Sequence, residues 1–512
     1  MSERATASLR RHWPLVAFPA AKLALHLATF AGYGIFRDEL YYLACSRRLA
    51  WGYVDQPPFS IAVLALERTF FGDSLLALRV VPALVGAAVV LLVGLTARRL
   101  GGGRFAQALA MSAALAAPHS LAIDHFYSMN TFDGLFWALA GWLLAGLLPE
   151  PEAPARRWLP LGVVLGLGLL NKLSVLWLGA GLAVGLLLSP ARRALRRPGP
   201  WAAAGLAFTL VLPHVVWQVV HGWPTLEFIA NATGQKMVRI APWDFLVSQV
   251  EMMSPLSLPV WLAGLVWLFR RPSWRALAWT WVAVALILVV NGASRPGYLA
   301  PAYAWLFAAG GVAWESAFER RRRPAWRWAL PAAVLAGGAV LAPLALPVLP
   351  VGRYVAYAEG LGREPTTDER KELAELPQFF ADMHGWRELA ATVEEVWLSL
   401  PARERATAVV FTSNYGEAGA VEHFARDPEL RRAVVSGHNS YWLWGPGDRD
   451  VRTVVAVNAD EEGLARVFGR VDLAARIDCG HCMPYENRAP VWIARDPTTT
   501  IQEVWPSVKH FD

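Results

Sequence analysis

The stretch FRDELYYLACSRRLAWGYVDQPPF, residues 36–59, lies between two long apolar runs and decides how the rest of the chain is interpreted. It gathers acids and tyrosines beside those runs, namely Asp38, Glu39, Tyr41, Tyr42, Tyr53 and Asp55. Ionisable groups next to a membrane segment are costly to hold, so this cluster indicates a functional site. The alternative is an interfacial loop whose tyrosines anchor at headgroup level while its acids face water.

The composition indicates a membrane protein. Of 512 residues, 55% are hydrophobic and only 17% are charged, which is too apolar for a soluble chain of this size. The net charge of +7 does not indicate nucleic acid, because the arginines stand in pairs and clusters at the ends of apolar runs, as cytoplasmic loops do. We therefore predict a polytopic α-helical protein of a bacterial inner (plasma) membrane.

The apolar runs along the chain predict about eleven membrane crossings. The block 158–188 has arginines at both ends, so we expect it to cross twice, as two short helices with a turn at Asn171, Lys172 and Ser174. The other runs lie near 13–34, 75–97, 105–122, 131–148, 201–220, 255–269, 276–291, 298–314 and 326–349. Arginine positions place the loops 36–74 and 221–254 outside the cytoplasm. Arg47, Arg48 and Arg68 oppose this rule, and we expect them at headgroup depth on a short interfacial helix.

Three segments follow from these patterns. Residues 1–350 form the transmembrane part, 351–384 are polar and read as a linker, and 385–512 alternate strands and helices as a small α/β domain does. In that domain we expect strands at 407–413, 432–436, 452–458 and 489–495, with helices near 385–400, 416–426 and 460–468. The topology places this domain outside the cytoplasm.

The opening stretch resembles the first outer loop of GT-C fold glycosyltransferases that use lipid-linked sugars, the protein O-mannosyltransferases and aminoarabinose transferases. Asp38 and Glu39 match the acidic pair of that loop, and GYVDQPP matches its closing segment. Further motifs are SMNTFDGLFW with Asp133, GLGLLNKLSVLWLG around Lys172, RPGYLAPAY with Arg295 and Tyr298, and the tail segments NYGEAGAVEHF and SGHNSYWLWGP. The resemblance covers most of the membrane part and implies sugar transfer from a polyprenyl-phosphate carrier.

Such a transfer needs one base for the acceptor and cations for the donor phosphate. We assign Asp38 as the base, with Glu39 as its catalytic neighbour. Lys172 and Arg295 are the candidate phosphate ligands, against the alternatives of snorkelling to headgroups and of ordinary loop charge. The other candidate substrate-binding residues are Tyr42, Asp55, Asp133 and Tyr298.

No cofactor is certain from the sequence. Asp55 and His221 are weak candidates for a divalent cation. In aminoarabinose transferases a histidine after the seventh helix assists a metal, whereas Asn231 and Thr233 stand near that position here. The expected partners are the polyprenyl-phosphate sugar, an acceptor that is a lipid, glycan or protein, and the bilayer, with no nucleic acid.

Two other classes of protein share some of these features. A secondary transporter would place its site at the midplane between repeated halves, but the polar residues here collect at one face and no repeat is evident. A thiol–disulfide protein would use Cys479 and Cys482 in the CGHC motif. Because Met483, Pro484 and a predicted strand follow, no helix has room to activate a thiol, which favours a structural disulfide or an unpaired thiol pair.

Overall fold

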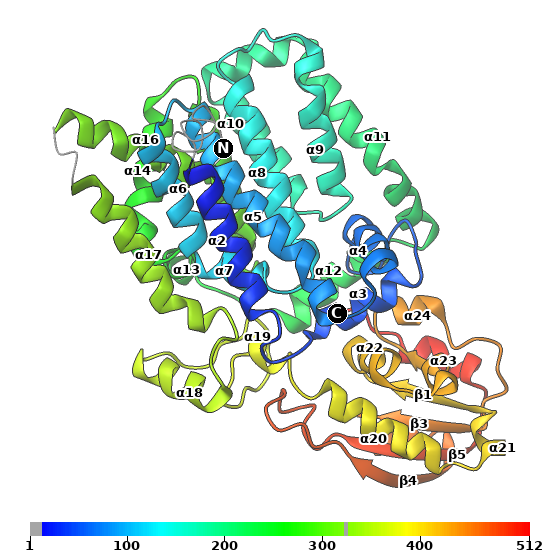
Figure 1. The fold of residues 1–512 in the computed structure, drawn as a ribbon. Helices are drawn as coiled ribbons and strands as arrows, with labels where there is room; N and C mark the ends of the chain where they lie inside the picture. Colours follow the sequence, from blue (N-terminus) through cyan, green and yellow to red (C-terminus); the bar gives the residue numbers. More distant parts are fainter. Residues whose placement is uncertain (1–12, 322–325) are drawn as a thin grey trace.

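The computed structural model describes residues 13–321 and 326–512. The arginines at positions 10, 11, 322 and 323, which helped to assign the sides of the membrane, lie outside these ranges. The described part before residue 350 is a bundle of helices, and a twisted five-stranded sheet lies at one end of that bundle (Figure 1).

Every predicted apolar run contains a helix, and the predicted break at residues 171–174 separates two short ones. These helices are α2 (Pro14–Thr29), α5 (Leu75–Arg99), α6 (Arg104–Ala116), α8 (Met129–Leu147), α9 (Leu159–Leu169), α10 (Val175–Leu187), α11 (Pro198–Val220), α14 (Leu258–Arg270), α15 (Arg275–Asn291), α16 (Tyr303–Arg320) and α17 (Ala329–Leu341). Connecting helices are α3 (Arg37–Ser46), α4 (Phe59–Phe71), α7 (Pro118–Ile123), α12 (Pro224–Asn231) and α13 (Pro242–Met252). Short 3-10 or π turns are η1 (Ala155–Arg157), η2 (Pro190–Arg196), η3 (Ala232–Lys236), η4 (Pro255–Ser257), η5 (Pro296–Ala302), η6 (Trp326–Trp328) and η7 (Ala342–Leu344).

Three of the described helical segments are long and apolar enough to cross a bilayer, namely Leu75–Arg99, Pro198–Val220 and Trp326–Leu344. Up to five qualify if each of two sharply bent helix pairs counts as one span. The pairs are Val175–Leu187 with Pro190–Arg196, and Pro242–Met252 with Pro255–Arg270. The count of eleven crossings therefore stays a prediction.

Small residues let the helices of the bundle approach closely. A Cβ atom added to Gly310 of α16 would lie 2.1 Å from the carbonyl oxygen of Val260 in α14. The reciprocal contact is as tight, because a Cβ on Gly264 would lie 2.0 Å from the Leu306 oxygen. Such backbone contact is the packing mode that glycine permits between membrane helices.

The sheet has the order β2-β1-β3-β5-β4. Its strands are β1 (Ala408–Thr412), β2 (Val434–Ser436), β3 (Thr453–Val457), β4 (Phe468–Arg476) and β5 (Pro490–Pro497). The pairs β2–β1 and β1–β3 are parallel, and β3–β5 and β5–β4 are antiparallel. Alternate residues face opposite sides, so Val410 and Val455 pack in one core and Val409 and Val454 in another.

Helices cover both faces of this sheet, and four of its strands match the prediction. The helices are α20 (Trp386–Ser399), α21 (Ala402–Arg405), α22 (Tyr415–Phe424), α23 (Pro428–Arg432), α24 (Ser440–Trp444), α25 (Glu461–Ala465), α26 (Ile501–Val504) and the turn η8 (Trp505–Val508). Strand β4 was not predicted. It is an edge strand without fully buried positions, so its sequence FGRVDLAAR lacks apolar alternation.

The sheet region and the membrane part share one core at helix α3. Leu40, Tyr41 and Leu43 of α3 pack in the same buried cluster as Val421 of α22. The approach of α22 requires a glycine, because a Cβ on Gly419 would lie 2.9 Å from the backbone of Leu40. Figure 1 shows α22 beside α3 at the boundary between the bundle and the sheet.

Contacts at this junction give the arginines of the first loop partners within the protein. Arg48 forms an ion pair of 2.8 Å with Glu422 of α22, and Arg47 reaches both Glu422 and Asp73. Arg68 also pairs with Asp73. Carboxylates of the protein therefore pair with these three arginines, and their depth in the bilayer stays a prediction.

The stretch 351–384, expected to be a polar linker, is structured. It contains α18 (Val351–Gly360) and α19 (Gln378–Ala381), and the segment between them docks on the loop after η3. Met237 and Glu369 form a β-bridge there, and the Arg370 amide donates to the Lys236 oxygen at 2.9 Å. This docking brings a buried acid, Glu369, against the segment that follows η3.

Candidate active site

Asp38 is the accessible acid of the cluster. It is the second residue of α3, and its side chain is 35% exposed. The Tyr415 phenol, at the start of α22, donates a hydrogen bond of 2.9 Å to Asp38 Oδ1. Arg37 Nε lies 3.7 Å from the same oxygen. Asp38 is therefore held by one phenol and a weakly placed guanidinium, with the rest of the carboxylate open.

Glu39, the next residue of α3, is fully buried. Its carboxylate accepts hydrogen bonds from the Phe36 amide at 2.8 Å and the Tyr127 amide at 2.9 Å. It also forms a buried ion pair of 3.2 Å with Arg79 of α5. This geometry corrects the expectation of a catalytic Glu39, because its oxygens already bind protein donors. Glu39 caps α3 and ties it to α5.

Asp55 and Tyr42 lie on the same side as Asp38. The Tyr41 phenol hydrogen-bonds both Asp55 Oδ1 at 2.9 Å and Ser440 Oγ at 2.7 Å. Burial raises the pKa of Asp55 from its ordinary 3.8 to about 7, although the hydrogen bond from Tyr41 opposes this. The Tyr42 hydroxyl accepts from the Met129 amide at 3.1 Å, which joins the loop to the start of α8.

Lys172 and Asp133 form a polar pair where α8 begins. Lys172 Nζ lies 3.6 Å from Asp133 Oδ2 and donates to Asn130 Oδ1 at 2.7 Å. The same ammonium sits 4.7 Å from the ring centre of Tyr298 in η5. Asp133 is buried and also accepts from Ser174 Oγ at 2.6 Å. Lys172 and Tyr298 are thus brought together, while Asp133 is positioned to hold Lys172.

Arg295 lies beside Tyr298 but is already paired. Its Nη2 atom donates to Glu369 Oε1 at 2.7 Å, and Lys236 Nζ lies 3.7 Å from the same oxygen. Burial alone would raise the pKa of Glu369, but Lys236 and its cationic neighbours lower it from 4.5 to about 2. Arg295 also lies near enough to Asp38 for their charges to interact. Three cations, two of them missed in the sequence, therefore meet around Glu369: Lys236, Arg37 and Arg295.

His221 is not placed as a ligand beside Asp55. It caps the exposed end of α11, where its Nδ1 contacts the Trp217 oxygen at 2.8 Å and its ring stacks on Trp217. Among the described residues, the one group of three suitable side chains close enough to share a metal is His438, His510 and Asp512. Asp55 and His221 do not belong to that group.

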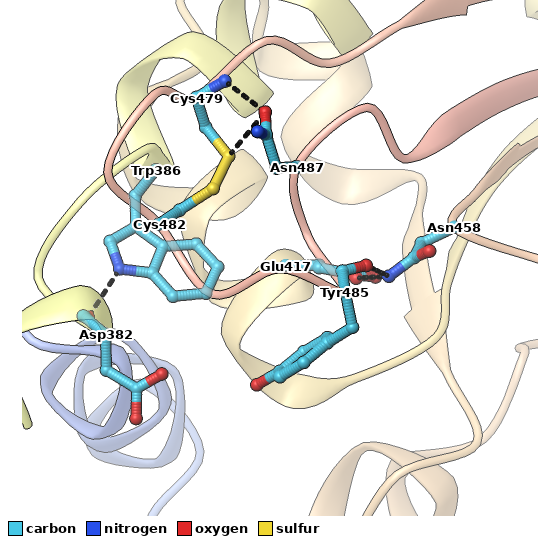
Figure 2. Close-up of a disulfide and its surroundings, with 8 residues drawn as sticks. All are labelled: Asp382, Trp386, Glu417, Asn458, Cys479, Cys482, Tyr485 and Asn487. Carbon is cyan, nitrogen blue, oxygen red and sulfur yellow. Dashed lines mark hydrogen bonds between the residues drawn. A yellow bond between two sulfur atoms is a disulfide. The ribbon is translucent and has the colours of Figure 1, made fainter. Parts of the chain in front are cut away.

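The CGHC motif forms a disulfide between Cys479 and Cys482, which is one of the two outcomes that the sequence left open. Figure 2 shows the bond against the Trp386 indole, with Asn487 Oδ1 accepting from the Cys479 amide at 3.3 Å. Turns follow Cys482, without the helix that a thiol–disulfide oxidoreductase needs. The same loop carries Tyr485, whose hydroxyl accepts from Arg37 Nη1 at 2.9 Å.

Sequence reasoning missed the contribution of the C-terminal region. Tyr415 stands in the NYGEAGAVEHF segment and Ser440 in SGHNSYWLWGP, the two tail motifs that had carried no chemistry. Their hydroxyls contact Asp38 and Tyr41. Glu369 and Lys236 stand in polar loops with no motif around them. The resemblance of the tail motifs was the one signal that pointed to this region.

Comparisons with known proteins agree with this architecture. Residues 55–217 match the family model described as dolichyl-phosphate-mannose-protein mannosyltransferase. The chain is 25% identical over 282 residues to the lipid A galacturonosyltransferase RgtD of Rhizobium johnstonii, covering 52% of this chain and 56% of the relative. It is 28% identical over 250 residues to the lipopolysaccharide core galacturonosyltransferase RgtB of the same organism, covering 48% and 49%. The chain thus matches about half the length of these curated relatives.

Solved structures match nearly the whole chain. ArnT from Cupriavidus metallidurans, crystallised with undecaprenyl phosphate, aligns with a TM-score of 0.61 at 15% identity over 94% of this chain and 98% of that one. The oligosaccharyltransferase AglB from Archaeoglobus fulgidus aligns with a TM-score of 0.50 at 12% identity over 88% and 70%. The chain therefore has the GT-C fold, and the resemblance stated from its sequence is confirmed. It is a polytopic helical membrane protein.

Proposed function

We propose that this protein is a glycosyltransferase that moves a sugar from a polyprenyl-phosphate carrier to an acceptor outside the cytoplasm. The observation that carries the proposal is the contrast within the acidic pair: Asp38 is partly exposed and 3.7 Å from the Arg37 guanidinium, whereas Glu39 is buried and paired with Arg79. One open carboxylate beside cations suits a reaction with one base and one anionic leaving group.

In the proposed reaction Asp38 accepts the proton of the acceptor hydroxyl or amine as that group attacks the anomeric carbon. The bond from that carbon to the carrier phosphate breaks, and the polyprenyl phosphate leaves as an anion that needs no general acid. A single displacement inverts the anomeric centre. Tyr415 orients Asp38 through its 2.9 Å hydrogen bond.

Lys172 and Arg295 are the proposed ligands of the carrier phosphate. Lys172 is 12% exposed and is held by Asn130 and Asp133, so its ammonium is fixed before a donor binds. Cations in such a partly desolvated place act more strongly on a developing phosphate charge than they would in water. Tyr298 contacts Lys172 and is a candidate ligand of the same phosphate.

The relatives support an acceptor in the cell envelope. The two curated relatives are named for transfer to lipid A and to the lipopolysaccharide core, and ArnT was crystallised with undecaprenyl phosphate. We infer a hexosyl or pentosyl group as cargo and an envelope glycan or lipid as acceptor. A transporter gains no support from the described site, whose polar residues lie at one end of the bundle.

The test uses cells with the gene deleted, so the sugar need not be known beforehand. Mass spectrometry of envelope glycans identifies the group that disappears on deletion, and the wild-type chain should restore it. The Asp38→Asn variant keeps an acceptor for the Tyr415 phenol but cannot take a proton, so transfer should fall by about 10²- to 10⁴-fold.

The matched control is Asp73→Asn, which changes an acid of the same outer loop that pairs with Arg68 and Arg47. It should restore the glycan as the wild type does. Full restoration by Asp38→Asn, at a membrane abundance equal to that of the wild type, would overturn the assignment of the base.

A further inference from the structure

Two imidazoles and a carboxylate converge where the last residues of the chain meet the end of β2. The ligand atoms of His438, His510 and Asp512 all lie within 4.8 Å of one another. His438 Nε2 is 3.4 Å from Asp512 Oδ1, and the two imidazole rings are 4.5 Å apart. Neither histidine belongs to the set of candidate active-site residues described above.

The backbone holds the two histidines side by side. His438 and His510 form a parallel β-bridge, in which the Asn439 amide donates to the His510 oxygen and the His510 amide to the Gly437 oxygen, both at 3.0 Å. Only glycine fits at 437, because a Cβ there would lie 1.9 Å from the Val508 oxygen. The spacing of the imidazoles is therefore fixed before any ligand binds.

The tail that carries His510 and Asp512 is also anchored to the membrane part. Asn231 Nδ2 donates to the Phe511 oxygen at 2.9 Å, and Lys509 Nζ forms an ion pair of 2.7 Å with Glu227 of α12. These contacts lie on both sides of His510. The ligands would therefore come from two segments, one at residue 438 and the other in a tail that α12 and residue 231 hold in place.

Both ring nitrogens of His510 face carbonyl oxygens, so a neutral imidazole has no hydrogen-bond donor for its second nitrogen. Its Nδ1 lies 3.0 Å from the Val508 oxygen, and its Nε2 lies 3.0 Å from the Ser413 oxygen. A neutral imidazole carries a single N–H, so it can donate to only one of these two carbonyls. Donation from Nδ1 to Val508 leaves the Nε2 lone pair facing an oxygen, an arrangement that a shared cation relieves. Ligating histidines commonly donate their other ring nitrogen to a carbonyl in this way.

The charges around the group do not oppose a cation. Lys236 and Arg37 are the cationic side chains whose charges act on His438, and each faces an acid: Lys236 lies 3.7 Å from Glu369, and Arg37 Nη2 lies 3.5 Å from Asp382. Lys509, next to His510 in the chain, pairs with Glu227 at 2.7 Å. Asp512 supplies an anionic ligand, whose Oδ1 lies 3.4 Å from His438 Nε2. Two imidazoles and one carboxylate are the donor set that borderline divalent ions such as Zn²⁺ prefer.

We propose that His438, His510 and Asp512 bind a divalent transition-metal ion of the zinc type, which fastens the tail beside Tyr415. The Tyr415 ring lies 4.6 Å from the His438 ring, and its amide approaches His438 Nδ1 at 3.4 Å. Ligation through His438 Nε2 puts the ring proton on Nδ1, so this long contact is given up when the ion binds. The ion is thereby linked to the residue that orients Asp38, although the metal site does not depend on the transferase reaction.

The experiment measures zinc in the full chain, purified in detergent through an affinity tag free of histidine. After incubation with ZnCl₂ and desalting, elemental mass spectrometry should find one zinc per chain in the wild type. The variants His438→Ala and His510→Gln should lose most of it. The matched control is His481→Ala, which removes an exposed histidine of the same region that pairs with Glu375, and it should retain the metal.

A second measurement protects the test against misfolded variants. Co²⁺ added to the metal-free wild type should give visible ligand-field bands, and ZnCl₂ should remove them. Zinc should also raise the unfolding temperature of the wild type and of His481→Ala, but not that of the two ligand variants. Absence of bound zinc in the wild type, absence of the cobalt bands, or retention of zinc by both ligand variants would overturn the proposal.

Discussion

Glu369 offers a quantitative test of how Arg295, a proposed phosphate ligand, and Lys236 are held together. It is 4% exposed, lies within 4 Å of Arg295 and Lys236, and accepts from Gln378 Nε2 at 3.1 Å. Glu369→Gln keeps the shape and removes the charge, so the two cations lose their shared partner. We expect the variant to be less stable than the wild type at neutral pH.

The size of this loss follows from proton linkage. The pKa of Glu369 lies at about 2 in the folded protein, against an ordinary value of 4.5. Each factor of ten in proton affinity is worth about 1.4 kcal/mol, so the ionised group stabilises the fold by about 3 kcal/mol at pH 7. Because the folded pKa is lowered, this stabilisation is fully present above pH 4.5 and is lost as the pH falls towards 2. At pH 3 about 1.5 kcal/mol should remain.

The assay is denaturant unfolding in detergent micelles, followed by tryptophan fluorescence at pH 7 and at pH 3. The control variant is Glu372→Gln, which changes an exposed acid of the same segment. The free energy of unfolding of Glu369→Gln should lie about 3 kcal/mol below that of the control at pH 7, with a smaller gap at pH 3. Equal stability of the two variants, or a gap that does not shrink in acid, would refute the reasoning.

Two further predictions concern the same region. The raised pKa of Asp55 means that the folded protein keeps a proton that the unfolded chain has lost, so stability should fall as the pH rises from about 4 to about 7. Asp55→Asn should remove this slope and be more stable at pH 8 by about 4 kcal/mol, measured by the same unfolding titration; an unchanged slope would contradict the assignment. Replacing both Cys479 and Cys482 by serine should cost about 2 kcal/mol of stability, since the disulfide closes a short loop, yet should leave glycan transfer in the deletion strain intact. Loss of transfer at normal membrane abundance would favour thiol chemistry instead.

The sequence predicted the helices and most of the strands because both patterns are local. Apolar runs flanked by arginine located the helices of the bundle, including the short pair on either side of residues 171–174. Short continuous apolar runs located β1, β3 and β5, which are largely buried, while the exposed edge strand β4 carries no such run. An element could be predicted from the sequence when at least one of its faces is buried, because burial requires apolar residues there.

The site was predicted only in part, for reasons of geometry. Asp38 and Glu39 are neighbours in the chain, but successive residues of a helix point about 100° apart, so they could not share one face. Their motif matched the family's acidic pair without showing which acid is open. Tyr415, Ser440 and Glu369 reach the site from distant segments, and nothing in their local sequence reports that contact.

The hydroxyls of Tyr415 and Ser440 cross from the sheet region to helix α3, and this bears on how such enzymes can be re-engineered. Exchanging the C-terminal portion with that of another GT-C protein would also remove the contacts that Tyr415 and Ser440 make with Asp38, the proposed base, and with Tyr41. A functional chimera would have to supply equivalent hydroxyls, together with a small residue where Gly419 meets Leu40. Residues 351–384 are therefore not a suitable boundary for grafting. The helical bundle and the sheet region have to be exchanged together.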